Sequence, residues 1–284
     1  MKKLMFAAAV AAGFAAFGVE SSNIVGYGTY NTEQAHLPSF GATFIPVTGG
    51  STYKLSILKP TDFDPDNDTI QLINPTTLGM DAAYVYMSKE IADAAAAEDG
   101  EPAGAYDELI GWWDAVIGIG EDGASADNVD IDVGTAFLGK FESGNNVEFI
   151  SSGEAPTVPT AINTDGERLP FIASYIPKTI KLGKIVPEDF DPDNDVIQVI
   201  NPTTLGMDAA YVYMSKEIAD AAAAEDGEPA GAYDELIGWW DAVLGIGEDG
   251  ASANNVDVNP GAAFLGKFES GNDITFNFPS VLAE

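Results

Sequence analysis

One stretch of 64 residues occurs twice in this chain and decides its fold. It begins FDPDNDTIQLINPTTLGMDAAYVYMSKEIADAAAAE and runs from Phe63 to Ala126, and it recurs 127 residues later from Phe190 to Ala253. Only three of the 64 positions differ between the copies: Thr69/Val196, Leu72/Val199 and Ile117/Leu244. Because even the loop residues are the same, the pattern indicates two copies of one module, produced by recent duplication or gene conversion.

The repeat divides the chain of 284 residues into tandem modules. It continues more loosely downstream, where residues 136–145 match residues 263–272, and upstream as short apolar and Pro-containing fragments. We expect a signal peptide at residues 1–18, a first β-module at 19–153, a linker and repeat start at 154–166, and a second β-module at 167–284. Each module then has an ordinary domain size.

Short β-branched and aromatic runs bounded by Pro, Gly and Asn are typical of strands, and they dominate each module. In the first module they cover residues 42–46, 69–73, 83–87, 135–141 and 146–150. Ser143-Gly144-Asn145 between the last two runs predicts a hairpin turn. Five or more strands per module predict a mainly β fold of two tandem sandwich- or barrel-like modules.

One segment of each module departs from the β pattern. Residues 88–98 begin with a Ser that can cap a helix and continue as an Ala-rich run, which Gly100 and Pro102 end. We therefore expect a short helical insertion in each module. The apolar residues that follow fall at helical spacing, yet Gly111–Asp114 also fits a strand that carries one Trp on each face.

The charge of the chain limits the classes of molecule that it can bind. Asp and Glu number 45 against 12 Lys and Arg, so the net charge is −33, while 46% of the residues are hydrophobic. The apolar fraction is that of a globular protein. So acidic a surface repels nucleic acid and anionic membranes and attracts cations. The chain has no Cys, which excludes disulfides, thiolate zinc sites and Cys nucleophiles.

The N-terminus has the parts of a secretory signal peptide. Lys2 and Lys3 precede an apolar, Ala-rich run that is too short for a membrane span, and small residues at Ala16 and Gly18 place cleavage after Gly18. Removal of the peptide would leave ten basic residues against 45 acidic ones, a net charge of −35. We expect a secreted protein, held at the cell surface, in the periplasm or outside the cell, with no membrane span.

The sharpest local motif is DFDPDND, which occurs once in each copy. D-x-D-x-D loops supply oxygen ligands to Ca²⁺, so the motif predicts a calcium site; the alternative is a solvated acidic turn between two strands. It departs from the EF-hand pattern because Thr69 and Val196 stand where that loop has Gly. The candidate ligands are Asp62, Asp64, Asp66 and Asp68 in the first copy and Asp189, Asp191, Asp193 and Asp195 in the second.

Two further features are weaker candidates. The acidic loop at residues 121–132 fits an ordinary surface turn, because Asp127 and Asp132 become Asn254 and Asn259 in the second copy. Aromatic side chains are the other candidate, since an exposed ring can stack on a sugar or pack against another module. We expect one Trp per module in the core and the other partly exposed, among Tyr84, Tyr86, Trp112 and Trp113 and Tyr211, Tyr213, Trp239 and Trp240.

Catalytic motifs are missing from the sequence. The single histidine, His36, corresponds to Arg168 in the second copy, so a duplicated mechanism based on His is excluded. No G-x-S-x-G, Walker A or H-E-x-x-H pattern occurs. We therefore expect no catalytic activity.

A resemblance to a family rests on short pieces spread over most of the chain. They are the N-I-V-G-Y start at Asn23–Tyr27, Phe44–Pro46, Ile70–Pro75, Trp112–Asp114 and Gly134–Leu138. With these, the chain resembles a group of uncharacterised secreted acidic β-repeat proteins of certain Gram-negative bacteria. The resemblance implies an exported, non-enzymatic surface or envelope protein, and it carries over no functional residues.

Taken together, these features predict a secreted or cell-surface structural or adhesive protein, steadied by Ca²⁺ if the Asp loops bind it. Its partners would be other surface proteins or further copies of itself. The alternative is a tandem pair of carbohydrate-binding modules, which would gain avidity from two like sites that bind glycans. A third interpretation is that the charge only keeps the protein soluble in salty surroundings.

Overall fold

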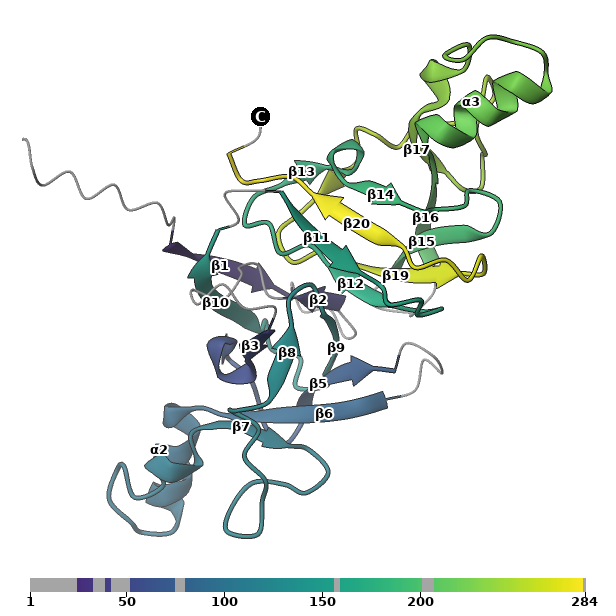
Figure 1. Ribbon diagram of the computed structural model, residues 1–284. Coiled ribbons are helices and arrows are strands. Elements are labelled where there is room, and N and C mark those ends of the chain that lie inside the picture. Colours follow the sequence, from purple (N-terminus) through teal and green to yellow (C-terminus); the bar gives the residue numbers. More distant parts are fainter. Residues whose placement is uncertain are drawn as a thin grey trace, which may run out of the picture.

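The computed structural model describes residues 25–32, 39–41, 52–74, 80–155, 159–200 and 207–282. The predicted signal peptide, His36 and the strand predicted at residues 42–46 lie outside the described residues. Within them the fold is mainly β and falls into two modules, each with one short α-helix (Figure 1). The predicted fold class is confirmed.

The first module contains ten strands among the described residues, one α-helix and two 3-10 helices. The strands are β1 (Val25–Asn31), β2 (Ser39–Gly41), β3 (Thr52–Lys54), β4 (Lys59–Thr61), β5 (Asp68–Ile73), β6 (Met80–Met87), β7 (Gly111–Asp114), β8 (Asp130–Asp132), β9 (Ala136–Phe141) and β10 (Glu148–Glu154). The helices are η1 (Leu55–Ile57), α2 (Lys89–Glu98) and η2 (Asp107–Leu109).

The second module repeats this list of elements. Its strands are β11 (Thr160–Asn163), β12 (Phe171–Ala173), β13 (Ile180–Lys181), β14 (Val186–Glu188), β15 (Asp195–Ile200), β16 (Met207–Met214), β17 (Gly238–Asp241), β18 (Asp257–Val258), β19 (Ala263–Phe268) and β20 (Thr275–Phe278). Its helices are η3 (Leu182–Lys184), α3 (Lys216–Glu225) and η4 (Asp234–Leu236).

The strands join in the same order in both modules. The first module has a three-stranded sheet β1-β10-β4, a five-stranded sheet β2-β9-β5-β6-β7 and a pair β3-β8. The second module has β11-β20-β14, β12-β19-β15-β16-β17 and β13-β18. The neighbouring strands pair antiparallel. Strand β10 ends at Glu154 and β11 begins at Thr160, so the two sets of sheets are separated by only five residues.

The predicted hairpin at Ser143–Asn145 is wrong. Strand β9 lies in the five-stranded sheet and β10 in the three-stranded sheet, so the chain crosses from one sheet to the other at this turn. The turn is held by contacts far away in the sequence: the Ser143 amide donates to the Asp68 carboxylate, and the Asn145 side chain donates to the Asp62 carbonyl. Strand propensity on both sides of a Gly-Asn turn does not reveal which sheet each strand joins.

Aromatic side chains fill the core between the sheets of the first module. Phe40 of β2 packs against Phe149 of β10 with ring centroids 4.3 Å apart, which ties the two larger sheets together. Trp112 is fully buried, lies edge-on to Phe63 and donates its indole N–H to the Leu58 carbonyl at 2.8 Å. A buried Trp that satisfies its polar atom in this way contributes its full apolar surface to the core. In the second module Trp239 and Phe190 form the corresponding contact.

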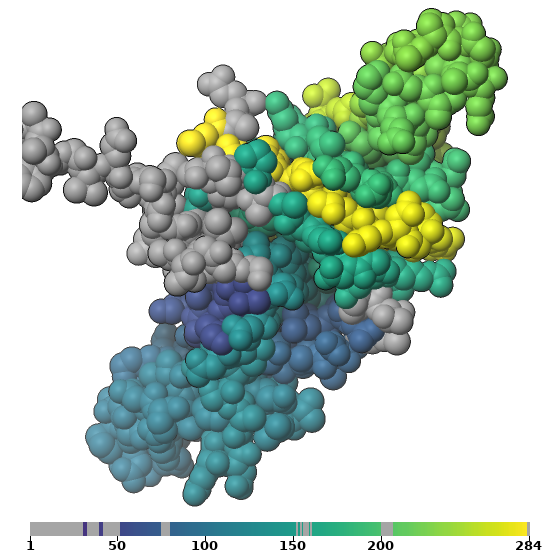
Figure 2. All heavy atoms as spheres, viewed as in Figure 1, coloured from purple at the N-terminus to yellow at the C-terminus, as the bar shows by residue number. Residues whose placement is uncertain are grey.

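The helical insertions lie at opposite ends of the molecule. Figure 1 shows α2 at the end of the first module and α3 at the far end of the second, with β2 and β12 between them. Figure 2 shows the α3 end as a lobe that projects from the body. The modules therefore meet through their inner strands and extend their helices and adjoining loops outward.

Candidate functional site

The last Asp of the DFDPDND loop points into the protein instead of toward solvent. Asp68 at the start of β5 is fully buried. Its carboxylate accepts three hydrogen bonds: from the Asp64 amide at 3.0 Å, from the Ser143 amide at 3.0 Å and from the Ser143 hydroxyl at 2.8 Å. A buried carboxylate is tolerated only with such partners. Asp68 therefore ties the loop to the crossover between β9 and β10.

The other carboxylates of this loop stay at or near the surface. Asp64 is half-buried and accepts from the Asp66 amide at 3.0 Å and the Asn67 side chain at 2.8 Å, which fixes the turn. Asp62 and Asp66 are exposed, and Asp62 has a positive φ of 56°. Asp tolerates this left-handed conformation better than most residues. The Asp64 carboxylate thus forms hydrogen bonds within the loop that fix the conformation of the loop.

The second module reproduces the loop closely. Asp195 is 2% exposed and accepts from the Asp191 and Ser270 amides at 2.9 and 3.0 Å. Asp191 accepts from the Asp193 amide at 3.0 Å, and Asp189 has a φ of 60°. The same geometry appears in both modules because the loop, the strand that follows it and the segment with the Ser partner have nearly the same sequence in the two copies.

The structure does not gather the four carboxylates of either loop around one point. Within the described residues, no group of three or more His, Cys, Asp or Glu side chains is placed to hold a metal ion. Ca²⁺ requires six to eight oxygen ligands. Asp64 and Asp68 already accept hydrogen bonds with both carboxylate oxygens, which leaves Asp62 and Asp66 as the free acidic groups of the loop. The calcium site stays a prediction.

The second acidic loop supplies a hydrogen-bond acceptor to the strand that carries the two Trp residues, which its acidic composition does not predict. Asp127 accepts a hydrogen bond from the Trp112 amide at 2.8 Å, and in the second module Asn254 accepts from the Trp239 amide at the same distance. The side-chain oxygen that Asp and Asn have in common is therefore the acceptor that this position requires. Gly111 lies against this carboxylate with a φ of 134°, where a Cβ would overlap it. The loop is therefore a support for the Trp strand.

The expectation that one Trp per module is exposed is wrong. Trp112 and Trp113 are 0% and 8% exposed, and Trp239 and Trp240 repeat these values. Residues 111–114 form strand β7, as the second of the two alternatives predicts, but its outer side chain is covered as well. The Trp113 indole N–H donates to the Leu109 carbonyl at 2.8 Å, because the loop after α2 folds over it. Neither indole face is available to stack on a sugar.

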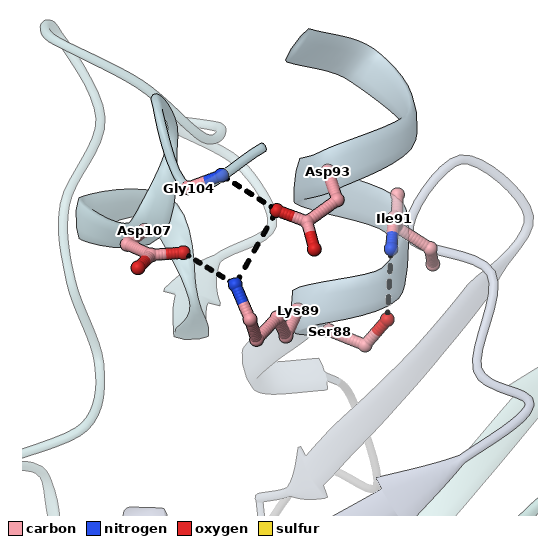
Figure 3. Close-up of polar contacts among 6 residues, drawn as sticks. All are labelled: Ser88, Lys89, Ile91, Asp93, Gly104 and Asp107. Carbon is pink, nitrogen blue, oxygen red and sulfur yellow. Dashed lines mark hydrogen bonds and ion pairs between the residues drawn. The ribbon is translucent and has the colours of Figure 1, made fainter. Parts of the chain in front are cut away.

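The segment that covers Trp113 is a small acidic lobe built on α2 (Figure 3). The Ser88 hydroxyl accepts from the Ile91 amide at 3.2 Å, which caps the helix as predicted. Lys89 binds Asp107 at 2.9 Å and Asp93 at 3.3 Å, and Asp93 also accepts from the Gly104 amide at 2.8 Å. Hydrogen bonds to these two carboxylates raise the pKa of the Lys89 ammonium.

This arrangement makes Lys89 the only basic group among residues 88–110, which contain seven acidic residues. It pairs with two of these seven carboxylates, those of Asp93 and Asp107. The second module repeats the cluster with Lys216, Asp220 and Asp234. Each end of the molecule is therefore strongly acidic and well ordered by its own contacts.

A pair of exposed aliphatic side chains follows the Trp strand in each module, and the sequence patterns did not predict its exposure. Val116 and Ile117 follow β7 and are 77% and 59% exposed. The Asp114 carboxylate accepts from both of their amides, at 2.8 and 3.0 Å, and so fixes the turn that presents them. Val243 and Leu244 occupy the same turn in the second module at 77% and 60% exposure. We call each of these pairs an aliphatic tip.

The chain was compared with protein-family models, with curated proteins and with solved structures, and none of the three comparisons gives a match. Within the part of the chain that the structure describes, no helix has both the length and the apolar character to cross a membrane.

Proposed function

We propose that the protein is a secreted or cell-surface structural or adhesive protein, without catalytic activity, that makes contacts through its two ends. The observation that carries this proposal is the aliphatic tip, which occurs twice in the same geometry. The two adjacent aliphatic side chains stay exposed to water in the fold and add nothing to its core, so burying them against another molecule would be favourable.

The position of the tips supports a bridging role. Each tip follows β7 or β17, the edge strand opposite β2 or β12 in its five-stranded sheet, and the two helices lie at opposite ends of the molecule (Figure 1). Two like contact points on one rigid body convert a weak contact into a strong one, since the second contact forms at a high effective concentration. A tandem protein that joins other surface proteins or copies of itself would use this geometry.

The acidity of the chain sets the conditions under which such contacts form. The mature chain would carry a net charge of −35, so copies of it repel one another at low ionic strength. At physiological ionic strength the Debye length falls to about 8 Å, and apolar tips can then meet without long-range repulsion. Self-association is therefore expected to strengthen as salt is added.

Sedimentation velocity of residues 19–284 over a range of concentrations tests the proposal. We expect concentration-dependent assembly at physiological ionic strength that is lost when Val116, Ile117, Val243 and Leu244 are all replaced by Ser. Replacement at one end alone should limit assembly to dimers, because each molecule then has a single contact point. A wild-type protein that stays monomeric at every concentration, or a four-site variant that assembles like the wild type, would contradict self-association through the tips.

Calcium is tested separately by thermal unfolding in CaCl₂ and in EGTA at matched ionic strength. A ligand that binds only the folded state, present at 100 times its Kd, adds about 2.7 kcal/mol per site. A calcium-specific rise that Asp62→Asn and Asp66→Asn abolish would support the proposal that Ca²⁺ steadies the modules. Equal melting temperatures in both buffers would assign the Asp loops a purely internal role.

A further inference from the structure

The two modules join through a closed ring of four short strands. Strand β2 pairs with β9 of its own module on one side, and on the other Phe40 forms an antiparallel bridge to Ala262, just before β19. Strand β12 pairs with its own β19, and Ile172 forms the matching bridge to Thr135, just before β9. Each module thereby covers the free edge of the other, which would otherwise offer unpaired backbone groups.

The hydrogen bonds of this junction are related by an approximate two-fold axis. The Gly41 amide donates to the Gly261 carbonyl at 3.1 Å, and the Ala173 amide donates to the Gly134 carbonyl at 2.7 Å. Gly41 and Ala173 hold corresponding positions in the two modules, and so do Gly134 and Gly261. An interface in which each side contributes the same patch is the isologous kind that symmetric homodimers use.

Small residues occupy the centre of the ring. Ala136, Ala173 and Ala263 form a buried cluster there. A Cβ placed on Gly41 would overlap the Cβ of Ala173 and would lie 2.9 Å from the Thr135 carbonyl oxygen. The pair formed by positions 41 and 173 therefore has room for one methyl group but not for two.

We infer that each module carries a self-complementary docking edge whose partner is another module of this kind, and that Gly41 opposite Ala173 restricts pairing to a first module with a second. Two second modules would place two methyl groups in the space for one. Two first modules would leave that space empty, which forfeits packing contacts. A second copy of the chain can supply the missing partner, so two chains can exchange modules, first with second in both directions.

This pairing is independent of the contacts proposed for the tips. It involves β2 and β12 at one edge of each five-stranded sheet, whereas the tips follow β7 and β17 at the other edge. Within one chain only five residues separate β10 from β11, so each module is present at a high effective concentration for the other and intramolecular pairing is favoured. A linker too short to allow that pairing should instead drive exchange between chains. The geometry thus makes two demands, one on positions 41 and 173 and one on the linker.

The first demand is tested with full-length mature protein by small-angle X-ray scattering and amide hydrogen exchange. Gly41→Ala should open the junction, with a larger radius of gyration and at least tenfold faster exchange of the Ala173 amide. The double variant Gly41→Ala/Ala173→Gly removes the overlap of the two methyl groups and leaves the Cβ of residue 41 only its 2.9 Å approach to the Thr135 carbonyl oxygen, so both values should return toward those of the wild type. A compact Gly41→Ala protein, or a double variant that stays open, would overturn the inference.

Fluorescence of the buried Trp112 and Trp239 serves as the folding control, since both lie in the module cores. A Gly41→Ala chain that opens while its Trp emission stays unchanged has separated its modules without unfolding them. If Gly41→Ala unfolds the first module, the same double variant decides: rescue of folding supports the one-methyl rule, and failure of rescue refutes it.

The second demand is tested by deleting residues 156–158 and measuring the molar mass by light scattering. The shortened chain should be a dimer of exchanged modules, and adding Gly41→Ala should return it to monomers. The matched control adds Gly41→Ala together with Ala173→Gly, and this chain should again be a dimer. A shortened chain that remains a compact monomer, or that dimerises regardless of Gly41→Ala, would overturn exchange.

Discussion

Asp68 and Asp127 belong to the two acidic loops of the first module, and they use their carboxylates differently. Asp68 accepts three hydrogen bonds with both oxygens and is fully buried. Asp127 accepts from the Trp112 amide with one oxygen. The second module keeps Asp at the first position, as Asp195, but has Asn254 at the other, with the same 2.8 Å bond.

The difference teaches that an acidic sequence does not mean that every acidic group acts through its charge. A site that supplies one donor needs one acceptor, which Asn offers as well as Asp. A site that surrounds a side chain with donors on both oxygens needs a carboxylate, because the amide nitrogen of Asn would face a donor.

Gly111→Ala should cause the largest loss of stability, about 3 kcal/mol or more. Residue 111 has a φ of 134°, which is essentially restricted to Gly, and its Cβ would overlap the Asp127 carboxylate. Urea unfolding followed by circular dichroism measures the effect, and Gly238→Ala should match it in the second module. Normal stability of either variant would show that the strand can shift away from the loop.

Asp68→Asn should destabilise the first module by about 2 kcal/mol, since one of the donors around the side chain would face the new amide nitrogen. The second module should unfold as in the wild type and so acts as an internal reference. In the matched variant Asp195→Asn the second module should be the destabilised one, and the first should unfold as in the wild type. A loss below about 0.5 kcal/mol would mean that this site, like the one at Asp127, needs only one acceptor.

Two substitutions at Asp127 distinguish the contribution of its acceptor oxygen to stability from the contribution of its charge. Asp127→Asn should change stability by less than about 0.5 kcal/mol, because Asn254 already fills this role in the second module. Asp127→Ala should cost about 1 kcal/mol, since it leaves the Trp112 amide without its acceptor. The two variants are compared in one urea series. Equal losses for both would show that the charge, not the oxygen, is what the loop requires.

The smallest effect concerns Asp220 in the lobe of the second module. A hydrogen bond from the Gly231 amide, and after it the contact with Lys216, lowers the pKa of this carboxyl below 3.8. Because the pKa is lower in the folded state, the lobe gains stability above the unfolded pKa and loses it as the pH falls through the folded value. NMR titration of the carboxyl carbon should show the lowered pKa.

Lys216→Met is the control for that titration. The pKa of Asp220 should rise only in part, because the Gly231 amide is the larger cause and stays in place. A return of the pKa to its ordinary value in this variant would assign the effect to the lysine.

Much of the local structure could be predicted from the chain. The repeat, the β-rich runs at residues 69–73 and 83–87, and the Ser-capped helix each depend on neighbours within a few residues. The hairpin at Ser143–Asn145 failed because its turn is fixed by Asp68, 75 residues away. The prediction that one Trp is partly exposed was wrong because the segment after α2 covers Trp113. The residue pattern within the strand gives no sign of that cover.

The candidate sites divide in the same way. The DFDPDND loops were visible as motifs, but their geometry assigns Asp68 to the interior and leaves Asp62 and Asp66 outside. The aliphatic tips at Val116 and Val243 were passed over because exposure, not residue type, distinguishes them from core residues. Exposure is a property of the assembled fold.

Two copies of one acidic, mainly β module with a capped helix in each could be predicted from the sequence, since these features depend on composition, repetition and contacts between near neighbours. Three-dimensional packing sets which sheet each strand joins, which carboxylates are buried, and that Gly41 meets Ala173 where the modules cover each other's edges. These outcomes depend on packing between residues many tens of positions apart, and such packing is set by shape and hydrogen-bond geometry that the order of residues does not display.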